Sequence, residues 1–260
     1  MSGLAFRARV RAGERVVATF CKLESLESVD LVAAAGFDAV VVDLEHSQID
    51  DAAASRLIRH ATALGLAALA RVPSVDAGLV NRLLEAGAAG VQLSSVRRVA
   101  QVEALRAALR YAPEGTRSVS SAHLAAGYGR VALGEYLAEQ RKDPPLLIGQ
   151  IETATTDDPL GDIVAGLDVA FVGTTDLSVD LGEPGAVDHP RVAARIAEIA
   201  EAAALAGVGF GGFAGGPAGY GALVEQGARY VVYGSDLQLL REALLAAGAQ
   251  LRAGGRREGP

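Results

Sequence analysis

The chain has 260 residues, half of them apolar and about a fifth charged, a composition typical of a globular domain. Its formal net charge is −7 and it has no basic block, which argues against nucleic acid as the main partner. A single cysteine excludes an intrachain disulfide, no apolar run could span a bilayer, and the first residues lack a signal-peptide core. We therefore expect a soluble, cytoplasmic protein with no membrane association.

Short apolar runs alternate with helical patterns along the chain. Strands are predicted at residues 16–21, 40–46, 66–71, 89–93, 146–152, 168–173, 208–213 and 230–233. Helices are predicted at residues 24–35, 51–63, 76–85, 97–109, 131–140, 190–205, 217–226 and 236–251. Residues 112–130 and 174–189 are predicted as loops, the first of them rich in glycine, serine and alanine.

This alternation of strands and helices implies an α/β fold with a parallel sheet and helical crossovers. About 250 residues is also the usual length of a (β/α)8 TIM barrel, so a closed barrel is favoured over an open doubly wound sheet. We predict a single barrel domain over residues 1–252, followed by a disordered tail at 253–260.

Polar side chains follow several of the predicted strands, and a barrel brings the carboxyl ends of all its strands to one face. These side chains are Asp43, Glu45, His46, Arg71, Gln150, Glu152 and Asp176. Glu152 and Asp176 come from adjacent strand ends and form an oxygen-rich pair that suits Mg²⁺, Mn²⁺ or Co²⁺. Such a metal would bind a 2-oxo acid through its carboxylate and keto oxygens and stabilise an enolate.

Other side chains could assist this chemistry. Arg71 could donate to the developing enolate oxygen, and His46 is the natural acid/base. Glu85, one turn before the next strand, could hold and polarise His46. Our strand boundaries place no lysine at these strand ends, and a Schiff-base aldolase needs one, so we expect the metal route. His123 lies in the loose loop, where a structural role and a place in an acceptor pocket are equally consistent with the sequence.

Short motifs lie at residues 34–38, 42–46, 71–73, 83–88, 111–117, 150–153 and 173–178. In this order and spacing they resemble the HpcH/HpaI aldolases, which are metal-dependent class II pyruvate aldolases. The resemblance implies a (β/α)8 barrel in a homo-oligomer, commonly a hexamer built of dimers that exchange the last helix.

The resemblance also implies roles for individual residues. Glu152 and Asp176 would be the metal ligands, and Gln150, Thr175 and Asp176 would contact the substrate. His46 would be the general acid/base, Glu85 its supporting carboxylate, and Arg71 the residue that steadies the enolate. Asp43 and Glu45 would then support these groups or hold water.

The chain departs from the family pattern at residues 118–129, where an expected arginine is replaced by Ala125. This loss favours a neutral or differently placed acceptor. One function is reversible aldol cleavage of a 4-hydroxy-2-oxo acid to pyruvate and an aldehyde. A second uses the same site to decarboxylate an oxaloacetate-like acid or to form another carbon–carbon bond. A third is a non-catalytic barrel retained for binding or assembly, which the set His46, Arg71, Glu152 and Asp176 disfavours.

Overall fold

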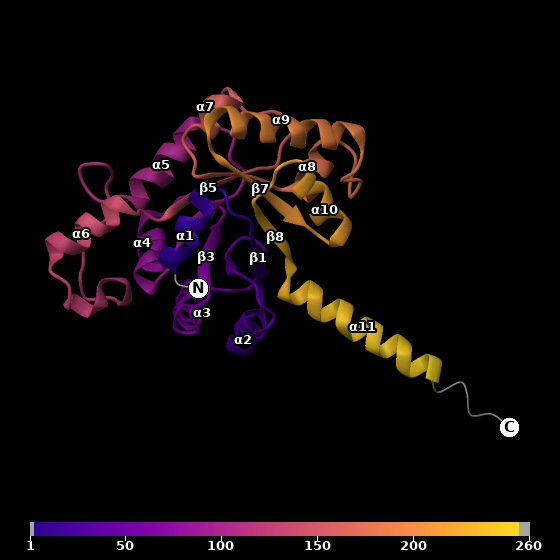
Figure 1. Ribbon diagram of the computed structural model, residues 1–260, viewed down its shortest axis with the longest axis horizontal. Helices are drawn as coiled ribbons and strands as arrows, with labels where there is room; N and C mark the ends of the chain where they lie inside the picture. Colours follow the sequence, from indigo (N-terminus) through magenta and orange to yellow (C-terminus); the bar gives the residue numbers. More distant parts are fainter. Residues whose placement is uncertain (1–2, 255–260) are drawn as a thin grey trace.

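The computed structural model describes residues 3–254, in which eight parallel strands close into a barrel in chain order (Figure 1). The strands are β1 (Val16–Cys21), β2 (Ala39–Asp43), β3 (Ala67–Val72), β4 (Gly90–Leu93), β5 (Leu146–Ile151), β6 (Val169–Val172), β7 (Gly209–Ala214) and β8 (Tyr230–Ser235). The predicted (β/α)8 barrel is confirmed. The largest difference in a strand boundary is at β2, which ends at Asp43 and leaves Glu45 and His46 in the following loop.

Helices cover the outside of the barrel. Those near predicted positions are α2 (Leu26–Ala34), α3 (Asp51–Ala63), α4 (Ala77–Ala86), α5 (Val99–Leu109), α6 (Leu133–Lys142), α9 (Pro190–Ala206), α10 (Pro217–Glu225) and α11 (Asp236–Gly254). Those that we did not predict are α1 (Gly3–Arg11), α7 (Leu160–Val164), α8 (Thr174–Asp180) and the 3₁₀ helix η1 (Leu124–Gly129). Most of these are too short to display the apolar repeat that identifies a helix in sequence.

Strand residues alternate between the barrel interior and the helical layer. Along β2, Val40 and Val42 pack in the outer cluster with helix residues, whereas Ala39 and Val41 belong to the inner cluster. Both faces are therefore buried, which is why the strand is a continuous apolar run. Asp43 continues the inward-facing series at the carboxyl end of the strand.

Helix α1 packs at the amino-terminal end of the barrel. Phe6 is fully buried in the inner cluster, and its ring meets the ring of Tyr230 edge-on, with 6.5 Å between centroids. Arg7 reinforces this position by donating from Nε and Nη2 to Asp143. Helix α1 thus covers the amino-terminal end of the barrel. The cavity lies at the opposite end, where the strands end.

Helix α11 extends away from the barrel (Figure 1). Its leucines at 240, 244, 245 and 251 are exposed in this chain. The helix continues to Gly254, so it includes the first two residues of the predicted tail, whereas residues 255–260 lie outside the described part. No helix within residues 3–254 is long and apolar enough to cross a membrane.

Candidate active site

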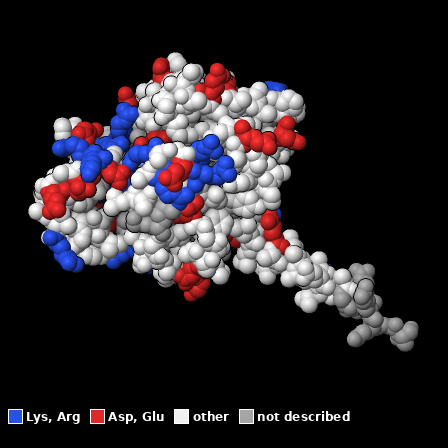
Figure 2. Space-filling model, in the orientation of Figure 1, with Lys and Arg blue, Asp and Glu red and all other residues white. Residues whose placement is uncertain are grey.

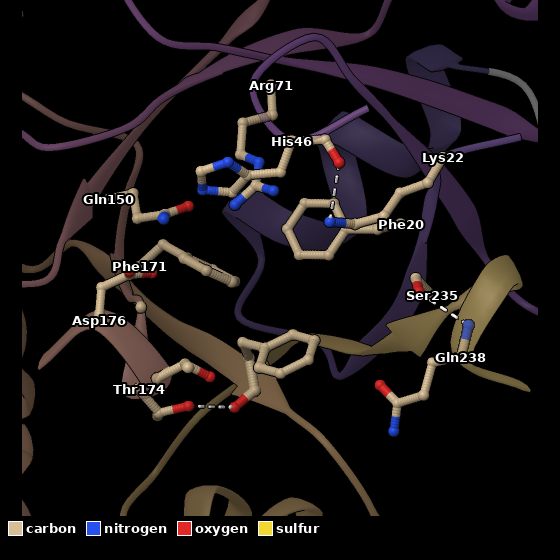
Figure 3. A pocket seen from close by; sticks show the side chains of 13 residues that line it. Phe20, Lys22, His46, Arg71, Gln150, Phe171, Thr174, Asp176, Ser235 and Gln238 are labelled. Carbon is tan, nitrogen blue, oxygen red and sulfur yellow. Dashed lines mark hydrogen bonds between the residues drawn. The ribbon is translucent and has the colours of Figure 1, made fainter. Parts of the chain in front are cut away.

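The inward-facing residues at the carboxyl ends of the strands surround a cavity of about 280 Å³ (Figure 3). This volume is close to the lower limit of small-molecule sites, which suits a metabolite of a few carbons. Among the predicted site residues, the cavity brings together His46, Arg71, Gln150, Thr175 and Asp176. They come from β3, β5, α8 and the loop after β2, and the barrel makes them neighbours despite their separation in sequence.

Asp43 fixes two parts of this site. Its carboxylate has no exposed surface and accepts hydrogen bonds from Arg71 Nε at 2.9 Å and Arg71 Nη2 at 2.7 Å. It also accepts from the backbone N–H groups of Glu45 and His46, which sets the turn after β2. Burial alone would raise the pKa of Asp43, but Arg71 and Lys22 outweigh it and lower the pKa to about 2. The carboxylate therefore stays ionised and holds Arg71 in place.

His46 and Glu45 lie together at the rim. His46 is mostly exposed, and its Nε2 lies 3.8 Å from Glu45 Oε2. The same Glu45 oxygen lies 3.3 Å from Nη1 of Arg71. Glu85 lies on α4, where it accepts a hydrogen bond from Asn81 at 3.2 Å. Within one chain, the carboxylate beside His46 is therefore Glu45, and the pairing of His46 with Glu85 stays a prediction.

Glu152 is held from two sides. Its Oε1 accepts from the backbone N–H of Ser95 at 2.8 Å and from the Ser95 hydroxyl at 2.7 Å, while its Oε2 accepts from Gln150 Nε2. The pKa of Glu152 is raised, mainly because the carboxylate is buried. Hydrogen bonds from Gln150 and Ser95 lower the pKa, but the charges of Asp176 and Glu45 raise it further. Ser95 is a site residue that no sequence pattern indicates. It has a positive φ of 52°, which turns its two donors toward Glu152.

Lys22 corrects one part of the sequence analysis. It directly follows β1 and lines the cavity, so the expectation of no lysine at a strand end was wrong. Its Nζ lies 3.1 Å from Asp43 Oδ2 and donates to the His46 carbonyl at 3.3 Å. This ion pair requires the ammonium form, whereas Schiff-base formation requires the neutral amine. The inward alternation of Val16, Ala18 and Phe20 would have placed Lys22 at the mouth.

His123 lies in the loop between α5 and α6. It is buried, its Nε2 lies 2.9 Å from the Ser120 carbonyl, and its ring meets the ring of Tyr136 edge-on. The Tyr136 hydroxyl in turn contacts the hydroxyl of Tyr111 at 3.1 Å. In this chain these contacts order the loop, and the role of His123 in an acceptor pocket stays a prediction.

The fold and the cavity can be compared with known proteins. Residues 17–243 match the model of the HpcH/HpaI aldolase/citrate lyase family. The chain belongs to this family. It is similar to the hydroxypyruvate/pyruvate aldolase of Sagittula stellata, with 30% identity over 94% of this chain and 96% of that protein. It is also similar to the 5-keto-4-deoxy-D-glucarate aldolase of Klebsiella pneumoniae, with 32% identity over 92% and 93% of the two chains.

A solved HpcH/HpaI aldolase from Desulfitobacterium hafniense has the same fold. Its TM-score to this chain is 0.87, with 30% identity over 98% of this chain and 97% of that chain. The match extends over almost the whole length of both proteins. The present chain is therefore an enzyme of the class II aldolase kind, a class that is generally dependent on a divalent metal.

The donor set of this aldolase fits a divalent cation. Asp176 lines the cavity, whereas Glu152 is not among its lining residues and accepts a hydrogen bond from Gln150, which does line it. The charge of Asp176 contributes to the raised pKa of Glu152, so the two carboxylates are close enough to repel each other. A cation between them would remove that repulsion. A side chain at position 173 would collide with Glu152, so Gly173 keeps this space open. Within residues 3–254 no group of three or more His, Cys, Asp or Glu could hold a metal, so water or substrate would supply the other ligands.

Proposed function

We propose that the protein catalyses reversible aldol cleavage of a 4-hydroxy-2-oxo acid to pyruvate and an aldehyde. Glu152 and Asp176 would hold the divalent cation, which would be Mg²⁺, Mn²⁺ or Co²⁺. The observation that carries the proposal is the pair of neighbouring carboxylates: Asp176 lines the cavity with Arg71 and His46, and its charge raises the pKa of the buried Glu152. When bound, the cation supplies Lewis-acid polarisation of the substrate ketone.

The chain's own residues supply binding, charge stabilisation and proton transfer. Gln150 has one amide hydrogen engaged with Glu152, which leaves the other for the substrate, and Thr175 lines the same end. Arg71 is held rigidly by Asp43 and by the ring of Phe20, whose centroid is 4.1 Å from the guanidinium carbon. Its remaining N–H groups can therefore stabilise negative charge on the substrate oxygen without rearrangement.

His46 is the proposed proton-transfer residue. In cleavage, its ring accepts the proton of the C4 hydroxyl, the C3–C4 bond breaks, and the aldehyde forms at C4. The electron pair left at C3 then takes up a proton, which completes pyruvate. Glu45, 3.8 Å from Nε2 of His46, stabilises the protonated ring between these steps. The reverse sequence joins pyruvate to the aldehyde.

The proposed assembly is a homo-oligomer, a hexamer or trimer of dimers, in which α11 packs against a second copy. Figure 2 shows little charge on the visible side of the extended helix, in contrast to the barrel. Leu244 and Leu245 are 63% and 61% exposed, which is unusual for neighbouring leucines on a helix. We place this assembly in the cytoplasm, since the single Cys21 is a buried free thiol that suits a reducing compartment.

The test is exchange of the pyruvate methyl protons in D₂O, followed by NMR. We expect exchange with Mg²⁺, Mn²⁺ or Co²⁺ and its loss with a chelator or in Glu152→Ala. Glu103→Ala removes an exposed carboxylate on α5 and serves as the matched control. Absence of exchange with every one of the three metals would contradict the proposal.

A second assay separates aldol cleavage from the other uses of this site. The wild-type protein is incubated with oxaloacetate, and carbon dioxide is measured. It is also incubated with pyruvate and a panel of aldehydes, and new 4-hydroxy-2-oxo acids are identified. Products from the aldehydes support the aldolase proposal, whereas rapid decarboxylation without any aldol product would favour the alternative.

A further inference from the structure

The cavity has a second polar end, away from the carboxylates. This second end is lined by Lys22, Ser235 and Gln238. Gln150 and Asp176 line the opposite side of the cavity (Figure 3). Lys22 follows β1 and Ser235 ends β8, and these strands are neighbours in the barrel with Phe20 paired to Ser235. The barrel thus builds this end from the first and last strands of the chain.

The groups at this end have hydrogen-bond donors available for a ligand. An ammonium has three N–H donors, and among the described residues Asp43 Oδ2 and the His46 carbonyl account for two. The Ser235 hydroxyl accepts from the backbone N–H of Gln238 at 3.1 Å, which leaves its proton for a ligand. Two donors that line the same end of the cavity, one of them charged, match a group that only accepts, such as a carboxylate.

Asp43, the carboxylate nearest to Lys22, is shared with a second cation. Arg71 donates two hydrogen bonds to Asp43 and also pairs with Glu45 at 3.3 Å, whereas the Lys22 ammonium pairs with Asp43. Asp236 also lies nearby, but its carboxylate oxygens already accept from four donors. These donors are the backbone N–H groups of Lys22, Leu23 and Leu237 and the hydroxyl of Ser28. The Lys22 side chain is 22% exposed, so solvent screens its charge only in part.

We propose that Lys22 binds an anionic group of the acceptor and thereby makes the enzyme prefer aldehydes that carry a carboxylate. This proposal rests on the proposed function, which assigns the Gln150 and Asp176 end to the 2-oxo acid. The acceptor then occupies the Lys22 end, with its aldehyde carbon toward the pyruvate methyl group. In the addition, that methyl carbon loses one proton and bonds to the aldehyde carbon, and the aldehyde oxygen gains one proton. Lys22 thus supplies a cation at the acceptor end of the cavity, in a chain that has Ala125 in place of the arginine expected in the loop at 118–129.

The kinetic test compares two small acceptors that differ in charge. Glyoxylate carries a carboxylate and glycolaldehyde is neutral, and each is condensed with pyruvate. We expect Lys22→Met to lower the ratio of kcat/KM for glyoxylate to that for glycolaldehyde by about tenfold or more, since a charge-assisted hydrogen bond is lost. Both values come from one preparation, so partial unfolding cancels in the ratio.

Two further variants separate charge from structure. Lys22→Arg keeps the cation and should retain most of the preference for glyoxylate. Lys142, on the exposed side of α6, is the other lysine of the chain. Lys142→Met therefore makes the same change in net charge away from the cavity and should leave the ratio at the wild-type value.

A binding measurement does not depend on turnover. Incorporation of ¹³C-labelled lysine labels both lysines without altering their ammonium groups, and the two variants assign their NMR signals. With Mg²⁺ and pyruvate present, glycolate should shift the Lys22 signal and not the Lys142 signal, whereas neutral ethylene glycol should shift neither. An unchanged kinetic ratio in Lys22→Met, or equal shifts of Lys22 with both probes, would overturn the assignment of Lys22. If the wild-type protein also fails to exchange pyruvate protons, the proposed function fails and this inference falls with it.

Discussion

Ser95 donates two hydrogen bonds to one carboxylate oxygen of Glu152, from its backbone N–H at 2.8 Å and from its hydroxyl at 2.7 Å. Ser95 therefore orients Glu152, the proposed metal ligand, from outside the metal site. Gln150 holds the other oxygen, and Gln92 in turn donates to Gln150 at 2.6 Å. Loss of a group that orients a metal ligand in this way typically lowers metal affinity or activity by about 10–100-fold.

The first prediction concerns Ser95. Ser95→Gly removes the hydroxyl and tolerates the positive φ, so the loss of one hydrogen bond is not confused with strain. We expect the metal concentration for half-maximal pyruvate exchange to rise by about tenfold or more. Titration of the exchange rate with Mn²⁺ measures this. A curve that coincides with the wild-type curve would show that Ser95 does not support the metal site.

The second prediction concerns the space beside Glu152. A Cβ at Gly173 would collide with Glu152 Oε2, so Gly173→Ala should displace the carboxylate and abolish tight binding of Mn²⁺. Gly161→Ala, on α7, is the matched control because an added Cβ there meets no atom within 4 Å. Calorimetric titration with Mn²⁺ compares the two variants. Equal affinities would contradict the placement of the metal at Glu152.

The third prediction concerns stability at low pH. The pKa of Asp43 is lowered from 3.8 to about 2 in the folded state. The ionised carboxylate therefore adds to the free energy of unfolding above pH 4, and this contribution is lost as the pH falls through 2. The shift corresponds to about 2 kcal/mol of unfolding free energy. We expect Asp43→Asn to be less stable than the wild type at pH 6, by a difference that shrinks between pH 4 and 2. Urea unfolding at each pH measures the difference, and a constant difference would contradict the ionised Asp43–Arg71 pair.

The fourth prediction concerns α11. Replacing both Leu244 and Leu245 by glutamate puts charge on the exposed apolar side of the helix, where a second copy is proposed to pack. We expect a smaller mass by light scattering and an unchanged circular dichroism spectrum. Gln250→Glu adds charge to the same helix without removing a leucine and should keep the wild-type mass. An unchanged mass for the double variant would remove α11 from the interface.

The barrel itself was predictable because its signals are local and repeated. Val40 to Val42 form an apolar run because parallel strands are buried on both faces. Asp76 and Gly87 marked the ends of α4, where Asp76 accepts from the N–H of Leu79 and Gly87 adopts a left-handed conformation. Such residues indicate an element without knowledge of the rest of the chain.

The site was predictable in part, for a different reason. Chemical type and position after a strand selected residues such as Arg71 and Asp176, which do line the cavity. Lys22 was missed because the first strand was not followed to its next inward-facing position. Ser95 was missed because a non-glycine residue with positive φ has no sequence signal. The proximity of Glu45 to His46 depends on the turn that Asp43 fixes, which the sequence pattern does not specify.

The most direct test of the account is the release of pyruvate from 4-hydroxy-2-oxoglutarate, whose cleavage would give pyruvate and glyoxylate. With Mn²⁺, we expect the wild-type protein to form the two products in equal amounts, and we expect Glu152→Ala or a chelator to abolish both. Pyruvate can be followed by its enzymatic reduction to lactate, and glyoxylate by NMR. Failure of the wild-type protein to release pyruvate with any of the three metals, or release that persists with the chelator, would contradict the account.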